Sequence, residues 1–120
     1  MNNEDIVLKS EGKQLYSYIY VADAVSGILK LLFDANRGEA YNLSNPQSDI
    51  TIKNLAFLIA KEVNREVVFE LPDEIEKVGY STATKAVLRV DKLNDLGWKP
   101  LFTIQTEIAH TIAILKQCKS

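Results

Sequence analysis

The sequence has little of the residue types from which metal sites and many catalytic sites are built. Its 120 residues include one histidine, His110, and one cysteine, Cys118. A protein zinc site needs several His, Cys or carboxylate ligands, and a disulfide needs two cysteines. We therefore expect no metal site and no intrachain disulfide. An unpaired cysteine is typical of a reducing compartment.

Glycines are few and scattered along the chain. The five glycines stand at positions 12, 27, 38, 79 and 97. A dinucleotide-binding loop needs clustered glycines, because its backbone must approach the pyrophosphate closely at the start of a helix. The chain is therefore not expected to bind NAD or any other cofactor in this way.

Excess positive charge and long apolar stretches are also lacking. Fourteen Lys and Arg residues face 16 Asp and Glu residues, for a formal net charge of −2. This charge excludes nucleic-acid binding driven by overall attraction to phosphate. The longest apolar run, residues 28–33, is interrupted by Lys30 and is far too short to cross a membrane. We expect one cytoplasmic domain over residues 1–120, with residues 1–5 disordered.

What the sequence does contain is a series of amphipathic segments and short strands. Apolar residues at helical spacing predict helices over residues 21–33, 52–63 and 104–116, and a short helix over 91–96. Alternating or short apolar runs predict strands over residues 6–8, 14–20, 39–43 and 66–70. Residues 71–86 are expected to form a long loop. The predicted fold is a small α/β domain with three main helices and a few short strands.

Several residues are typical of helix ends. Thr51 is a predicted N-cap, and Asp91 is a second. Gly97 is expected to close the short helix in a left-handed conformation, with Trp98 packing on Leu93 as in a Schellman motif.

Candidate catalytic groups are sparse. His110 is expected to have a structural or solvated role on the last helix rather than a catalytic one. Asp73, Glu74 and Glu76 lie in a segment without the apolar surroundings that raise a carboxyl pKa, which favours a solvated acidic loop. Composition and spacing alone indicate a soluble α/β domain of unassigned function.

Three passages, in order, carry a resemblance to a known family. They are residues 12–24 (GKQLYSYIYVADA), residues 38–56 (GEAYNL followed by ITIKNLA) and residues 91–100 (DKLNDLGWKP). Together they resemble the C-terminal, substrate-binding domain of the NAD-dependent epimerase/dehydratase family. These proteins are extended short-chain dehydrogenases that act on sugar nucleotides as epimerases, dehydratases or decarboxylases.

The resemblance implies that the catalytic parts of the family lie outside this chain. The Rossmann domain with its NAD, its glycine-rich loop and its Tyr-x-x-x-Lys pair would precede residue 1. Tyr80 and Lys85 are one residue too far apart to be that pair, and they lie in the wrong part of the fold. No catalytic residue is therefore assigned, and the isolated chain is expected to be inactive.

The resemblance also implies a substrate-binding site. Lys85 and Arg89 are candidates for contacts with the phosphates, together with Tyr16 and Gln14. Tyr16 stands where many relatives have arginine, so it offers a hydroxyl but no positive charge. For each of these residues a purely structural or solvated role stays open. Asp23 is either a functional acid of its motif or a structural partner for free amides at a helix start.

Two functional hypotheses follow. The first is a sugar-nucleotide-binding and closure domain, partnered by the missing Rossmann domain. The alternative is a free-standing protein-interaction module that uses the aromatic strand Tyr16–Tyr20. Because separating two domains uncovers apolar surface, we also expect self-association, through residues 21–33 or through this strand.

Overall fold

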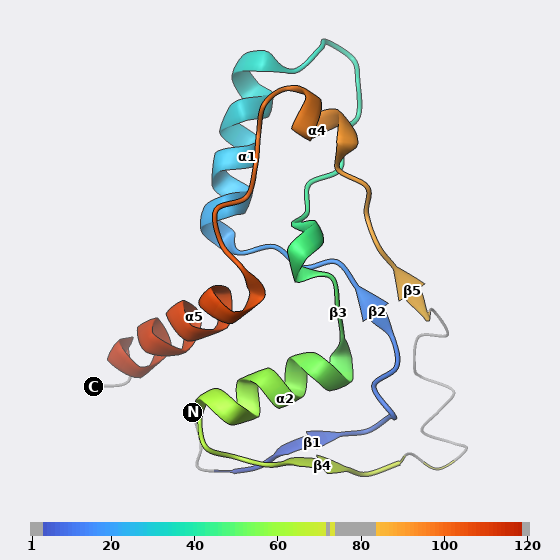
Figure 1. Cartoon of the computed structure of the whole chain (residues 1–120), viewed down its shortest axis with the longest axis vertical. Helices are drawn as coiled ribbons and strands as arrows, with labels where there is room; N and C mark the ends of the chain where they lie inside the picture. Colours follow the sequence, from blue (N-terminus) through green and yellow to red (C-terminus); the bar gives the residue numbers. More distant parts are fainter. Residues whose placement is uncertain (1–3, 72, 74–83, 119–120) are drawn as a thin grey trace.

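A computed structural model describes residues 4–71, 73 and 84–118 of the chain (Figure 1). Helices and short strands alternate along the sequence. In order, they are β1 (Ile6–Leu8), β2 (Leu15–Tyr16), α1 (Val21–Asp34), the 3-10 helix η1 (Pro46–Ser48), β3 (Ile50–Thr51), α2 (Ile52–Glu62), β4 (Val67–Phe69), β5 (Lys85–Ala86), α4 (Asp91–Asp95) and α5 (Ile104–Cys118). The structure thus confirms the predicted small α/β fold.

The described strands form two small sheets. β1 pairs in parallel with β4, so that Ile6 lies beside Val67. In the second sheet β2 is central: it runs antiparallel to β3 and parallel to β5. Figure 1 shows α1 and α4 at one end of the molecule and β1 and β4 at the other, with the three-stranded sheet between them.

The molecule is flat and its core is small. Its extents are 47 × 39 × 20 Å and its radius of gyration is 17.0 Å, whereas a compact chain of this length has about 13–14 Å. In the described part of the chain, seven apolar residues are buried: Ala56, Ala60, Val90, Leu93, Trp98, Ile104 and Ile112. They come mainly from α2, α4 and α5, so the chain leaves a large part of its apolar surface uncovered.

The predicted helix ends are largely confirmed. Thr51 is the N-cap of α2, and its hydroxyl accepts a hydrogen bond of 3.2 Å from the Asn54 amide. Gly97 has φ of 95°, and the Trp98 amide donates to the Leu93 carbonyl at 3.3 Å. This last bond belongs to a Schellman motif, in which Trp98 and Leu93 are both buried.

Two predicted strands differ from the structure. Within the predicted strand over residues 14–20, β2 covers only Leu15 and Tyr16. Its partner β3 begins at Ile50, opposite Tyr16, and the chain just before β3 forms η1 instead of continuing the ladder. The predicted strand over residues 39–43 is wrong. Hydrogen bonds from side chains, and not the backbone hydrogen bonds of a sheet, fix this segment. For example, the Lys92 ammonium donates to the Ala40 carbonyl at 3.1 Å.

Three further boundaries also differ from the predictions. Val90, not Asp91, is the N-cap of α4, and the Asp91 carboxylate pairs with Arg89 instead. α5 extends to Cys118. Within the predicted loop over residues 71–86, Lys85 and Ala86 form β5 because β2 offers them a free edge.

Candidate functional site

The pairing of β2 with β5 brings three of the four predicted site residues together. The Leu15 amide donates to the Thr84 carbonyl at 3.0 Å, and the Ser17 amide to the Ala86 carbonyl at 3.1 Å. Leu15 therefore lies beside Lys85, and Tyr16 beside Ala86. Gln14 and Tyr16 are thus near Lys85 along the paired strands although they are distant from it in sequence.

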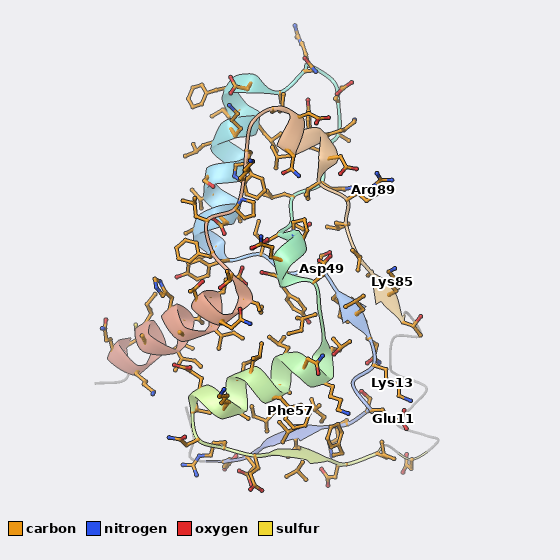
Figure 2. All side chains as sticks on the ribbon, viewed as in Figure 1. Glu11, Lys13, Asp49, Phe57, Lys85 and Arg89 are labelled. Carbon is orange, nitrogen blue, oxygen red and sulfur yellow. The ribbon has the colours of Figure 1, made fainter. Side chains whose placement is uncertain are left out.

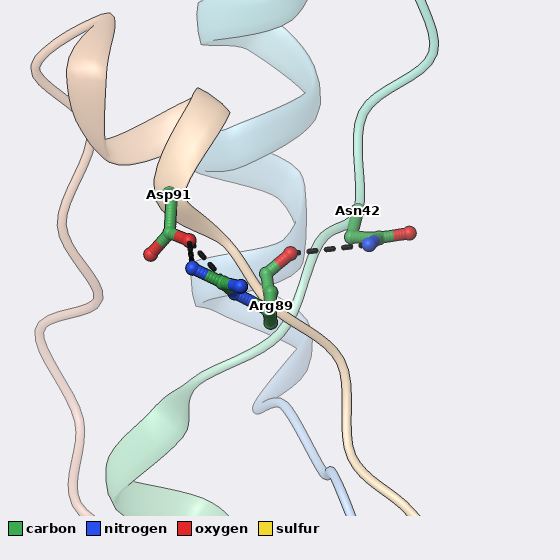
Figure 3. Close-up of polar contacts among 3 residues, drawn as sticks. All are labelled: Asn42, Arg89 and Asp91. Carbon is green, nitrogen blue, oxygen red and sulfur yellow. Dashed lines mark hydrogen bonds and ion pairs between the residues drawn. The ribbon is translucent and has the colours of Figure 1, made fainter.

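Side chains from two other segments hold the chain between β5 and α4. The Ser17 hydroxyl accepts a hydrogen bond of 2.8 Å from the Leu88 amide. The Asn42 side-chain amide donates to the Arg89 carbonyl at 3.1 Å (Figure 3). Both bonds fix backbone atoms, so they position Arg89 while leaving its guanidinium free to point outward.

The Arg89 guanidinium is engaged with a neighbour. Its Nη2 and Nε atoms lie 2.7 and 2.9 Å from one carboxylate oxygen of Asp91 (Figure 3). The Arg89 side chain is 87% exposed, and an exposed ion pair of this kind contributes at most about 1 kcal/mol. An incoming anion can therefore displace Asp91 from Arg89 at little cost.

Lys85 lies on the outer edge of the second sheet. It is exposed on β5 and makes no ion pair with any residue that the structure describes. Figure 2 shows Lys85 and Arg89 along the same edge of the molecule. Two cations on one edge are suited to an anionic ligand such as a diphosphate.

Gln14 and Tyr16 are both half-buried beside this edge. The backbone carbonyl of Gln14 accepts a hydrogen bond of 3.1 Å from the Ile52 amide. Its side-chain oxygen Oε1 is buried and has no partner among the described residues, as is also true of Asp49 Oδ1. A buried acceptor without a donor is unfavourable, so each oxygen is a place where a hydrogen-bond donor would be stabilising.

Tyr18 continues the row of aromatic residues. Burial raises its pKa above the ordinary value, and the nearby Tyr16 raises it further. The Tyr18 carbonyl accepts a hydrogen bond from the Asn45 amide at 3.3 Å. Tyr18 is therefore held as a neutral phenol at physiological pH.

Asp23 has a structural role. Its carboxylate is 1% exposed and accepts hydrogen bonds from the Leu101 and Phe102 amides at 2.8 and 3.1 Å. The free amides that it satisfies belong to the segment before α5, not to its own helix. Asp23 thus ties the start of α1 to the C-terminal helix.

A second buried polar cluster was missed in the sequence. Glu107 Oε1 accepts a hydrogen bond of 2.7 Å from the Ser48 hydroxyl and one of 3.3 Å from the Asn45 side-chain amide. That amide also donates to the Phe102 carbonyl at 2.7 Å. Asn45 looked like a simple turn residue, and no local pattern links it to Glu107. The cluster fixes η1 against α5.

The remaining candidates lie away from the site or outside the described residues. His110 is exposed on α5, where its ring lies 5.4 Å from that of Phe102 and 6.1 Å from that of Tyr20. Tyr80, Glu74 and Glu76 lie outside the described residues. Over the described ranges, no three His, Cys, Asp or Glu side chains are grouped so that they could hold a metal ion. Helices in this part of the chain are all too short or too polar to cross a membrane.

Known proteins resemble the chain in both sequence and structure. UDP-D-apiose/UDP-D-xylose synthase 2 of Arabidopsis thaliana is 26% identical over 93% of the chain. UDP-glucose 4-epimerase of Thermotoga maritima, solved with UDP-glucose, matches 98% of the chain with a TM-score of 0.81 and 20% identity. The chain has the fold of the C-terminal part of extended short-chain dehydrogenases.

A third relative supports the same fold. The dTDP-glucose 4,6-dehydratase of Bacillus anthracis, solved with NAD, matches 95% of the chain with a TM-score of 0.79 and 16% identity. The chain covers 35% of that protein, 36% of the epimerase and 32% of the synthase. It therefore spans about a third of their length. No family model matches the chain.

Proposed function

We propose that this chain is the sugar-nucleotide-binding and closure domain of an NAD-dependent epimerase or dehydratase, and that it is inactive alone. One observation carries the proposal. The β2–β5 pairing places Gln14 and Tyr16 next to the strand that carries Lys85, and Lys85 and Arg89 lie along one edge of the molecule (Figure 2). This arrangement belongs to a fold shared with proteins solved with UDP-glucose and with NAD.

The four side chains offer complementary contacts to a nucleoside diphosphate sugar. Arg89 exchanges Asp91 for a phosphate oxygen, and Lys85 adds a second positive charge. The Tyr16 hydroxyl donates one hydrogen bond. Gln14 Oε1 accepts one from a sugar hydroxyl or a base N–H, which satisfies its unpartnered oxygen.

The hydride carrier and the catalytic base are assigned to a partner domain of the Rossmann type. The residues of this chain do not form a glycine-rich loop for NAD, because its glycines are isolated in the sequence. Two of them instead allow close packing within the fold. Gly12 lies against the backbone of Lys53 at the start of α2, and Gly27 lies against Leu43 and Trp98. Residues 1–120 thus act as one substrate-binding unit.

A ligand titration tests the binding proposal. Amide NMR spectra recorded with UDP, UDP-glucose and a dTDP-sugar should show shifts at Gln14, Tyr16, Lys85 and Arg89. Lys85→Ala and Arg89→Ala should each weaken binding about tenfold, as expected for one charge-assisted hydrogen bond. Lys61→Ala, which removes an exposed lysine from α2, is the control and should bind normally. Unchanged spectra at millimolar ligand would refute the proposal.

The interaction-module hypothesis receives less support. It depends on an uncovered aromatic strand, but β2 is paired with β3 on one edge and with β5 on the other. Tyr16, Tyr18 and Tyr20 are all half-buried. Among the described residues, exposed apolar side chains gather instead on α1.

A further inference from the structure

The backbone at Leu88 and Arg89 is held by side chains from other segments. These two residues lie between β5 and α4, in neither a strand nor a helix. The Leu88 amide donates to the Ser17 hydroxyl at 2.8 Å, and the Leu88 carbonyl accepts from the Ser44 hydroxyl at 3.4 Å. The Arg89 carbonyl accepts from the Asn42 side-chain amide at 3.1 Å (Figure 3). A single substitution can therefore remove one of these bonds without changing the Arg89 side chain.

Two of these side chains come from residues 40–44, a stretch that includes most of a predicted strand. Its alternate residues bond to one neighbouring segment, as the period of two in an extended chain allows. The Ala40 carbonyl accepts from the Lys92 ammonium at 3.1 Å. Asn42 and Ser44 donate to the backbone just before α4. The two segments are thus joined at every second residue through side chains.

The support for Arg89 is itself fixed to the core. Leu43 packs so closely against Gly27 of α1 that a Cβ atom at Gly27 would collide with the Leu43 side chain. Ser44 and Asn45 are both buried. A segment that is anchored on one side can hold the backbone that it bonds on the other.

A fixed backbone lowers the cost of binding an anion with Arg89. The Arg89 side chain is 87% exposed, and the Asp91 side chain that it pairs with is 63% exposed. When the guanidinium leaves Asp91 for a phosphate oxygen, the backbone of Arg89 does not have to be ordered at the same time. Ordering a mobile segment on binding costs free energy, and pre-organisation avoids this cost.

We propose that Asn42 and Ser44 are positioning residues for the phosphate contact of Arg89. The inference rests on the proposed function and deepens it, since it assigns a part in ligand affinity to side chains that touch no ligand. Because both residues act through Arg89, their removal cannot weaken binding by more than the roughly tenfold expected for Arg89→Ala.

A double-mutant cycle on the whole chain tests the positioning role, with NMR titration of UDP as the measurement. Asn42→Ala should raise the dissociation constant about fivefold in the wild-type and Lys85→Ala backgrounds. It should change little in Arg89→Ala, which has no guanidinium to position. Ser44→Ala should follow this pattern more weakly, because its bond is longer. Asn54→Ala, which removes an exposed amide from α2, is the control and should bind normally.

Amide hydrogen exchange gives a second measurement that needs no ligand. The Leu88 amide is bonded to Ser17, so its exchange reports how firmly this backbone is held. Asn42→Ala should speed exchange at Leu88 about fivefold. The Val63 amide, which donates to the Ile59 carbonyl at the end of α2, should exchange at the wild-type rate, because the loosening is local.

The outcomes separate this inference from the proposed function. If the wild type binds UDP and Asn42→Ala binds it equally well, the positioning role is overturned while the proposed function stands. An equal loss in the Arg89→Ala and wild-type backgrounds would overturn the role too, because general destabilisation would then explain it. A wild type that binds no UDP at millimolar concentration overturns both. If circular dichroism shows Asn42→Ala unfolded, Ser44→Ala takes its place in the cycle.

Discussion

At the scale of single residues, Asp23 joins two distant parts of the fold through buried hydrogen bonds. Its buried carboxylate accepts hydrogen bonds from the Leu101 and Phe102 amides. Asp23→Ala leaves both amides without acceptors, so we expect the free energy of unfolding to fall by about 3 kcal/mol. Urea denaturation measures this loss. Asp95→Ala removes an exposed carboxylate from α4 and should change stability by less than about 0.5 kcal/mol; equal losses would contradict the role of Asp23.

Tyr18 makes the stability depend on alkaline pH. Because burial raises the pKa of its folded-state phenol, the folded protein holds this proton more tightly than the unfolded chain. The resulting stabilisation is complete below the unfolded-state pKa of about 10 and is lost as pH rises through the folded-state pKa. Urea denaturation should show a steeper alkaline decline for wild type than for Tyr18→Phe. Parallel curves would argue against a perturbed Tyr18.

At the scale of elements, the end of α4 depends on one backbone conformation. Gly97 has φ of 95°, which residues with a Cβ atom rarely adopt, although a Cβ here would meet only the Lys30 ammonium, at 3.9 Å. Gly97→Ala should therefore lower the free energy of unfolding by about 1 kcal/mol. Gly97→Asn should cost less, since asparagine tolerates this conformation. Thermal denaturation that ranks the two variants in the reverse order would contradict this explanation.

The elements also show how far the sequence predicts the fold. α1, α2 and α5 follow from helical periodicity, and Thr51 and Gly97 mark helix ends through local chemistry. β5 was not predicted, since a strand of two residues depends on the edge that β2 presents. The segment 39–43 was predicted as a strand from its short apolar run, but no described strand pairs with it.

The candidate site, like the fold, was predicted from the sequence only in part. Tyr16 and Gln14 were proposed as site residues from a motif, and Lys85 and Arg89 from their place in the resemblance; their role stays a prediction. The ion pair of Arg89 with Asp91 was not predicted, because Asp91 looked like a helix cap. The contact of Glu107 with Ser48 and Asn45 joins residues about sixty positions apart. Sequence periodicity reports the buried face of an element, but not which distant polar groups meet there.

At the scale of the whole molecule, a small core and the exposed apolar residues of α1, such as Val25 and Phe33, have a joint consequence. A flat chain with a radius of gyration of 17.0 Å buries less apolar surface than a compact domain, so its intrinsic stability should be low. The self-association expected through residues 21–33 would cover these residues, and association adds to stability by mass action. The melting temperature of the wild-type chain should therefore rise with protein concentration.

Scanning fluorimetry across a hundredfold concentration range measures this effect. Val25→Glu should melt at one temperature throughout, near that of the dilute wild type, because it has lost the contribution of the second copy. Val68→Glu, on β4 instead of α1, should keep the concentration dependence of the wild type. A constant wild-type melting temperature would show that the folded chain gains nothing from association, and that its small core alone sets its stability.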